Sequence, residues 1–85
     1  NNHKHIAEET IQYFYFYVRK KFNVNTNDMN DELYSIVSKL SGIDLGEVKK
    51  IFTYCQNLKH APSLTQYDLL ELNDRINNFK QKSIR

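Results

Sequence analysis

The feature that most constrains this chain is how few of its residues can break a helix. The 85 residues contain only two glycines and one proline, and these lie where helices are expected to stop or start. Between them, apolar side chains recur every three or four residues, a spacing that places them on one face of a helix. The recurrence covers four segments, at about residues 5–22, 31–41, 45–60 and 66–80. The pattern predicts an all-α, compact four-helix single domain with short turns.

Three of the four expected helices carry the same local start signal, an apolar residue followed by a capping residue. The capping residues are Asn30, Asp44 and Thr65, and Met29, Ile43 and Leu64 precede them. Glu47 and Asp68, three residues after two of these caps, are expected to complete capping boxes. Gly42 is expected to take the left-handed conformation that ends the helix over 31–41. These signals predict short turns, so that consecutive helices pack together as a bundle.

The expected core follows from the periodic apolar positions of each segment. The inward-facing residues are Ala7, Ile11, Phe14, Tyr15, Val18, Phe22, Leu33, Ile36, Val37, Leu40, Val48, Ile51, Phe52, Cys55, Leu69, Leu72, Ile76 and Phe79. Cys55 is assigned to this core because free cysteine is among the most buried residue types. Outside the four helices, residues 1–4 are expected to form a disordered stub and residues 81–85 a frayed tail.

The sequence disfavours enzymatic chemistry. A chain of this length buries roughly 60 to 65% of its unfolded surface, which leaves room for a core but not for a core and an enclosed substrate cavity. His3, His5, Cys55 and His60 lack the paired short spacing of structural zinc ligands. The two glycines are isolated and form no phosphate-binding loop. We therefore expect no catalytic residues, no metal and no cofactor.

The cysteine content and the first residues of the chain indicate the cellular compartment of the protein. A single cysteine cannot form an internal disulfide, and no signal-peptide pattern opens the chain, so we expect a cytoplasmic protein. The longest apolar run, residues 13–18, is far shorter than the roughly 20 residues that span a bilayer. This segment is therefore not expected to insert into a membrane. Because residue 1 is asparagine, we expect the chain to be part of a larger protein.

Five consecutive aromatic residues, from Tyr13 to Tyr17, are the most unusual stretch of the chain. With a period of two, this stretch fits a strand, but the longer periodic pattern around it favours a helix. Five adjacent side chains cover most of a helix circumference, so they cannot all enter one core face. Either this helix is central and packs on several sides, or Tyr13 and Tyr17, with Arg19 and Lys20, form a surface for an unknown protein partner. Assembly of identical subunits is a further possibility.

A second arrangement resembles helix-turn-helix proteins. Two expected helices flank Gly42, and Val48 and Ile51 follow at the spacing of that motif. Lys39, Lys49 and Lys50, with Arg19, would be the nucleic-acid contacts. The second helix, however, would begin with Asp44-Leu45-Gly46-Glu47, whose carboxylates oppose phosphate. The net charge of only +2 also comes from dispersed basic residues, so nucleic-acid binding is the alternative rather than the main hypothesis.

The order of these features resembles the C-terminal domain of a Bacteroidetes family of predicted membrane proteins of unknown function. The stretches that carry the resemblance are the aromatic helix ending at 18–22, the loop at 25–27, the turn at 40–43, and residues 48–52 and 70–79. The resemblance implies a cytoplasmic tail domain of a membrane-anchored parent. It also implies a helical adaptor that contributes no catalytic residues. Together with the aromatic helix, it leads us to expect a protein-interaction or regulatory domain.

Overall fold

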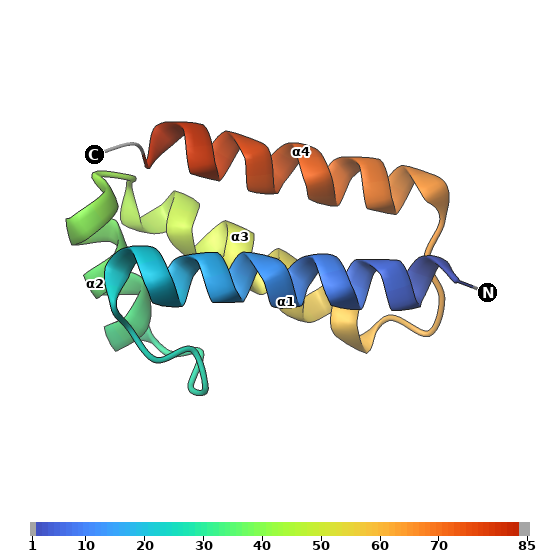
Figure 1. Cartoon of the computed structure of the whole chain (residues 1–85), viewed down its shortest axis with the longest axis horizontal. Helices are drawn as coiled ribbons and strands as arrows, with labels where there is room; N and C mark the ends of the chain where they lie inside the picture. The colour runs from blue at the N-terminus through green and yellow to red at the C-terminus, as the bar shows by residue number, and fades with distance from the viewer. Residues whose placement is uncertain (1, 84–85) are drawn as a thin grey trace.

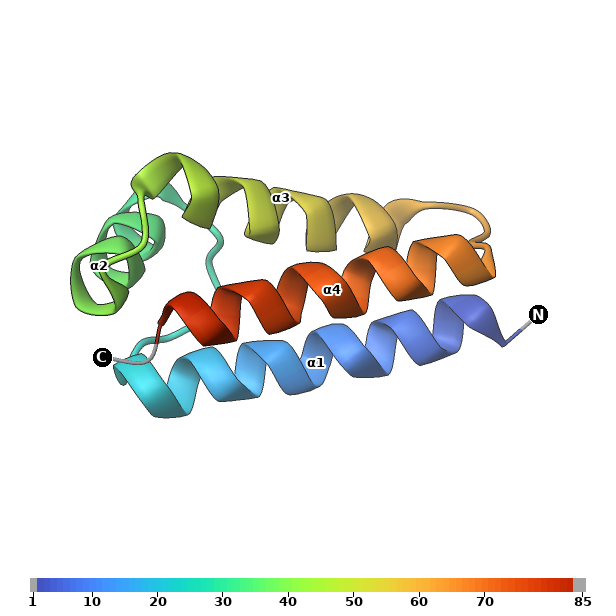
Figure 2. The same ribbon diagram turned by 90° about the horizontal axis from the view of Figure 1, so that it is seen from above.

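The computed structural model describes residues 2–83, which form helices α1 (His3–Phe22), α2 (Asp31–Ser41), α3 (Leu45–His60) and α4 (Gln66–Lys82). The prediction of an all-α single domain with four helices is confirmed. Helices α1 and α4 lie side by side and run in the same direction, whereas α3 runs the opposite way (Figure 1, Figure 2). Helix α2 lies at the end of the bundle where α1 and α4 finish, and packs against α1 and α3. Helix α1 therefore contacts every other helix.

Three phenylalanines, one from each long helix, meet in the core. The ring centroid of Phe14 is 5.3 Å from that of Phe79, with the rings at 87°, and 5.6 Å from that of Phe52. All three side chains are buried. Tilted and edge-to-face aromatic pairs add about 0.5–1.5 kcal/mol to the stabilisation expected from buried area. The inward positions expected for α1 and α3 are confirmed, and Cys55 lies in this core.

Helix α2 departs from the expected inward stripe. Ile36 and Leu40 are 38% and 50% exposed, whereas Tyr34 is 7% exposed and stacks on Phe52 at a centroid distance of 5.4 Å. Because α2 is covered by α1 and α3 on one side only, its buried face is narrow. Tyr34 occupies this face together with Leu33. The assignment of Ile36 and Leu40 to the core is therefore wrong.

The local start signals act as predicted at α2 and α4. The Asn30 side chain accepts a hydrogen bond of 3.0 Å from the backbone N–H of Leu33. At α4, the Thr65 hydroxyl accepts from the backbone N–H of Asp68, and the Asp68 carboxylate accepts from the backbone N–H of Thr65 at 2.8 Å. Each bond satisfies a backbone donor that a helix leaves unpaired at its first turn.

The turn between α2 and α3 is held by short-range hydrogen bonds. Gly42 has a φ of 78°, and its N–H donates to the Ser38 carbonyl at 2.9 Å. The Ser38 hydroxyl donates to the Ile43 carbonyl at 2.6 Å, and the Ser41 hydroxyl accepts from the Ile43 N–H at 3.0 Å. The left-handed end predicted for Gly42 is confirmed, and Ser38 supports the turn directly.

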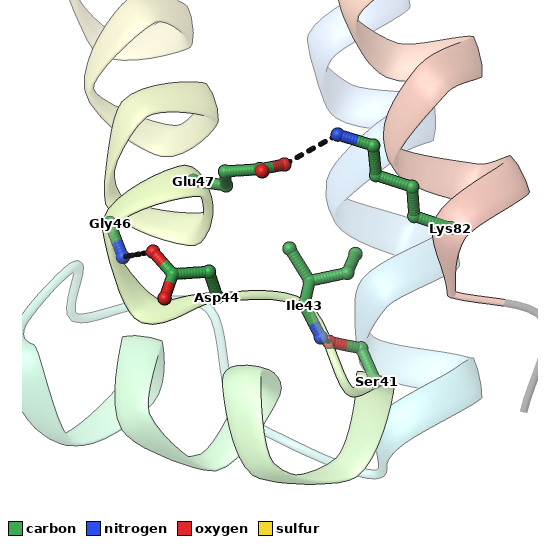
Figure 3. A network of polar contacts seen from close by, with 6 residues as sticks. All are labelled: Ser41, Ile43, Asp44, Gly46, Glu47 and Lys82. Atoms are coloured by element: carbon green, nitrogen blue, oxygen red, sulfur yellow. Dashed lines mark hydrogen bonds and ion pairs between the residues drawn. The ribbon is translucent and has the colours of Figure 1, made fainter.

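The capping box expected at the start of α3 does not form. The Asp44 carboxylate accepts from the Gly46 N–H at 3.0 Å, as a simple cap. The Glu47 carboxylate instead accepts from the Lys82 ammonium at 2.6 Å, so it joins α3 to the end of α4 (Figure 3). A partner from another helix has replaced the local one.

Helix α1 begins at His3, so the expected disordered stub is corrected for residues 3 and 4. The Lys4 ammonium donates to the carbonyl oxygens of Lys59 and Ala61, at 2.9 Å to Lys59. Carbonyls at a helix end lack partners within the helix and carry partial negative charge, so a cation is stabilising there. This contact orders the start of α1 against the end of α3. Asn1 lies outside the described residues.

Helix α4 ends at Lys82 rather than at residue 80. Ser83, just beyond it, is buried, and its hydroxyl shares a hydrogen bond of 3.1 Å with the Tyr17 hydroxyl. The expected frayed tail is therefore corrected for residues 81–83. Residues 84 and 85 lie outside the described part of the chain.

Candidate interaction surface on α1

The structure separates the two tyrosines that were expected to share a partner surface. Tyr13 is 73% exposed. Tyr17 is only partly exposed and packs against the core, with its hydroxyl bonded to Ser83 on the side where α4 lies. Tyr13 is thus available to a partner through most of its side chain, whereas Tyr17 is available only in part.

Phe16 is a candidate that the sequence interpretation did not select. Its side chain is 51% exposed, although its neighbours Phe14 and Tyr15 are buried. The Lys20 ammonium lies 5.6 Å from the centre of its ring, and the Arg19 guanidinium carbon lies 5.9 Å away. The spacing to Lys20 is four residues, which places both side chains on one helix face. The four-residue spacing from Phe16 to Lys20 is the sequence signal from which this pair could have been predicted.

Two further lysines surround Tyr17. The Lys21 ammonium lies 5.8 Å from the centre of its ring, and the Lys80 ammonium of α4 lies 4.9 Å from it. We call these side chains at the shared end of α1 and α4 the basic–aromatic patch. It consists of Phe16, Tyr17, Lys20, Lys21 and Lys80. Tyr13 lies one helical turn before Phe16 and Tyr17.

The charge of the basic–aromatic patch is uncompensated within residues 2–83. The ion pairs of this region join His5 to Glu9, Lys49 to Asp31, Arg75 to Glu71 and Lys82 to Glu47. None of them includes Lys20, Lys21 or Lys80. Cations in the last turn of a helix complement its dipole, which accounts for Lys20 and Lys21. The dipole does not account for the half-exposed ring of Phe16 beside Lys20.

Arg19 lies near the Phe16 ring, as Lys20 does, but it also bonds to the segment between α1 and α2. Its guanidinium donates a hydrogen bond of 2.7 Å to the hydroxyl of Thr26, in the segment between α1 and α2. Thr26 is buried, and Arg19 is only partly exposed. Arg19 therefore stabilises this connecting segment and contributes less to the outer face of α1 than the sequence suggested.

The alternative nucleic-acid contacts do not form one free basic surface. Lys49 lies 3.5 Å from the Asp31 carboxylate at the start of α2, while Lys39 and Lys50 are exposed. The first turn of α3, which reads bases in helix-turn-helix proteins, carries the Asp44 carboxylate on its backbone N–H. Figure 3 shows this acidic start beside Glu47. Such carboxylates would face phosphate and lower affinity.

Cys55 is fully buried, and burial raises the pKa of its thiol to about 12. Because the thiolate is the reactive form, the side chain acts as a small apolar core residue. Within residues 2–83 no three His, Cys, Asp or Glu side chains gather in a way that could hold a metal ion. In the same range, no helix combines the length and the apolarity needed to cross a bilayer.

The fold and its surface define a small helical domain without strands among its described residues. More particularly, the chain belongs to the family described as the DUF4350 C-terminal helical domain, whose family model matches residues 1–83. The chain matches no curated protein and no solved structure.

Proposed function

We propose that this domain is a non-catalytic protein-interaction module that binds an acidic segment of a partner protein through the basic–aromatic patch. The observation that carries the proposal is the half-exposed Phe16 ring with the Lys20 ammonium 5.6 Å from its centre. An exposed ring loses water favourably when a partner covers it, and an unpaired ammonium gains a carboxylate at the same time. Aromatic residues are enriched in protein interfaces for this reason.

The small apolar area of the patch favours a peptide over a lipid surface. Phe16 is half-exposed and the Tyr17 hydroxyl is bonded to Ser83, so little ring surface could insert into hydrocarbon beside the Lys20 cation. A peptide carboxylate can pair with that cation while an apolar neighbour covers the ring. We therefore assign the patch to an acidic protein segment.

The cellular setting is part of the same proposal. The family resemblance implies that the domain is the cytoplasmic tail of a larger, membrane-anchored bacterial protein. A buried free thiol is compatible with a reducing compartment. In that setting the domain would bring an acidic partner to the membrane without entering it.

A titration with a synthetic peptide of alternating glutamate and leucine, followed by NMR, tests the proposal. Amide resonances of residues 16–21 and of Lys80 should shift, and the affinity should fall as salt increases. Phe16→Ser should weaken binding about tenfold although the charge is unchanged. Its matched control is Tyr67→Ser, which removes an 83% exposed aromatic side chain from the start of α4.

Two outcomes would contradict the proposal. One is peptide affinity that is the same for Phe16→Ser and the unchanged chain, which would reduce the contact to unspecific charge attraction. The other is binding to vesicles of anionic phosphatidylglycerol without binding to the peptide, which would assign the patch to a membrane surface.

A further inference from the structure

A polar cavity lies between α1, the segment that joins α1 to α2, and the end of α3. Its volume is about 350 Å³, and Arg19, Lys59 and His60 are among its lining residues. Gln12 from α1 and Gln56 from α3 add side-chain amides. No Asp or Glu of the described residues lines it. The cavity thus combines cationic and amide donors without a carboxylate to neutralise them.

We propose that this cavity is a binding site for a small anion that carries a carboxylate or phosphate group. Arg19 is already oriented, because one of its guanidinium nitrogens donates to Thr26 at 2.7 Å. A guanidinium has five N–H donors in a fixed plane, so most of them stay available for an oxyanion. Neither Arg19 nor Lys59 forms an ion pair within residues 2–83.

The end of α3 would ordinarily repel an anion, since the carbonyl end of a helix carries partial negative charge. Here the Lys4 ammonium donates to the carbonyls of Lys59 and Ala61 and offsets that charge. The Lys59 ammonium lies 5.8 Å from the centre of the Tyr15 ring, beside the cavity. The charges around the cavity therefore remain positive at the point where α3 ends.

Tyr15 provides an independent observation. It lines the cavity, it is 6% exposed, and its hydroxyl has no hydrogen-bond partner within residues 2–83. Burial, together with nearby Cys55 and Tyr34, raises the pKa of this phenol, so it remains a donor. A buried donor without an acceptor is unfavourable. Because the phenol stays protonated, this wall of the cavity carries no negative charge that would repel an anion.

The proposed anion site differs from the basic–aromatic patch and does not depend on the proposed function. Lys20, Lys21 and Lys80 do not line the cavity. The ligand is also of another kind, a small molecule held between elements rather than a peptide laid on a surface. A chain that fails to bind the acidic peptide could still bind the anion, and the reverse also holds.

Titration of the 85-residue chain with inorganic phosphate, and separately with sodium succinate, at constant ionic strength tests the proposal. At least one of them should bind saturably and shift the side-chain amides of Gln12 and Gln56 and the Arg19 guanidinium. Lys59→Gln should weaken binding about tenfold, because it removes one of the charges that an anion in the cavity would meet. Its matched control is Lys50→Gln, the same charge change at an exposed position on α3.

Tighter binding of phosphate would assign the site to phosphate compounds, and tighter binding of succinate would assign it to carboxylates. Gln12→Ala gives a second readout that leaves the charge unchanged and should also weaken binding. The proposal is overturned if neither anion saturates, or if Lys59→Gln and Lys50→Gln weaken binding equally. Shifts spread over all lysine-bearing surfaces would overturn it as well.

Discussion

The hydroxyls of Tyr17 and Ser83 share a hydrogen bond of 3.1 Å, although 66 positions separate the two residues. The bond joins the end of α1 to the residue that follows α4, where the Lys21 and Lys80 ammoniums also lie over the Tyr17 ring. The Tyr17 side chain therefore contributes both to the packing of α1 beside α4 and to the basic–aromatic patch.

Tyr17→Phe should lower the free energy of unfolding by about 0.5–1.5 kcal/mol, the net contribution of one hydrogen bond. The Ser83 hydroxyl keeps its bond to the Lys80 carbonyl at 3.2 Å, so the loss should be at the low end. Urea denaturation measures the change. Tyr13→Phe, at an exposed position, is the control and should change stability by no more than a few tenths of a kcal/mol.

Two phenylalanines of the aromatic run, Phe14 and Phe16, should contribute very differently to stability, because one is buried and the other is half-exposed. Phe14→Ala should cost about 3–5 kcal/mol, because it leaves a cavity where three rings meet. Phe16→Ala should cost less than about 0.5 kcal/mol. Thermal and urea unfolding of the two variants gives the comparison. A loss of about 2 kcal/mol or more for Phe16→Ala would place that ring in the core and remove it from the patch.

Lys4→Met should destabilise the chain by about 1–2 kcal/mol, since it removes charge-assisted hydrogen bonds to the end of α3. The same change should speed amide exchange of Ala61, whose N–H bonds to the Leu58 carbonyl at 3.2 Å. Hydrogen exchange followed by NMR checks this local effect. Lys50→Met is the control, and equal exchange at Ala61 in all three chains would show that Lys4 does not stabilise the end of α3.

Stability should fall as the pH rises above about 9. The Cys55 thiol keeps its proton in the folded chain up to a pKa of about 12, whereas in the unfolded chain it ionises near 9.0. Between these values the unfolded chain binds fewer protons, so the unfolding free energy decreases by at most about 1.4 kcal/mol per pH unit for this group. Urea unfolding between pH 8 and 10 measures the slope. Cys55→Val should show a shallower decline.

Duplex DNA at low salt should not produce salt-sensitive NMR shifts concentrated at residues 44–51. The Asp44 and Glu47 carboxylates lie in the first turn of α3, and Lys49 is paired with Asp31. Spectra recorded in buffer alone and at higher salt show which NMR shifts are caused by DNA binding and how strongly they depend on salt. Concentrated, salt-sensitive shifts in that stretch would favour the helix-turn-helix interpretation over an acidic protein partner.

Features that depend on a few neighbouring residues were predictable. The cap at Asn30, the box at Thr65 and the left-handed Gly42 each involve bonds that span no more than four residues. A short stretch of sequence therefore contains both partners of each of these bonds. Helix number, helix order and the positions of the turns follow from them together with the apolar period.

Features that depend on which helix lies over a side chain were not predictable. Periodicity marks Ile36 and Leu40 as inward, but only Tyr34 and its side of α2 are covered. Tyr17 packs beside α4, whereas Phe16 lies outside the core. Glu47 bonds to Lys82 of α4 instead of to the backbone at the start of α3. The sequence determined the bounds of α2 and α3, because the hydrogen bonds that end them are local, whereas the start of α1 and the end of α4 lie beside contacts with other parts of the chain. Only the tertiary structure decided which aromatic and charged side chains remain exposed, because that depends on contacts between helices far apart in the chain.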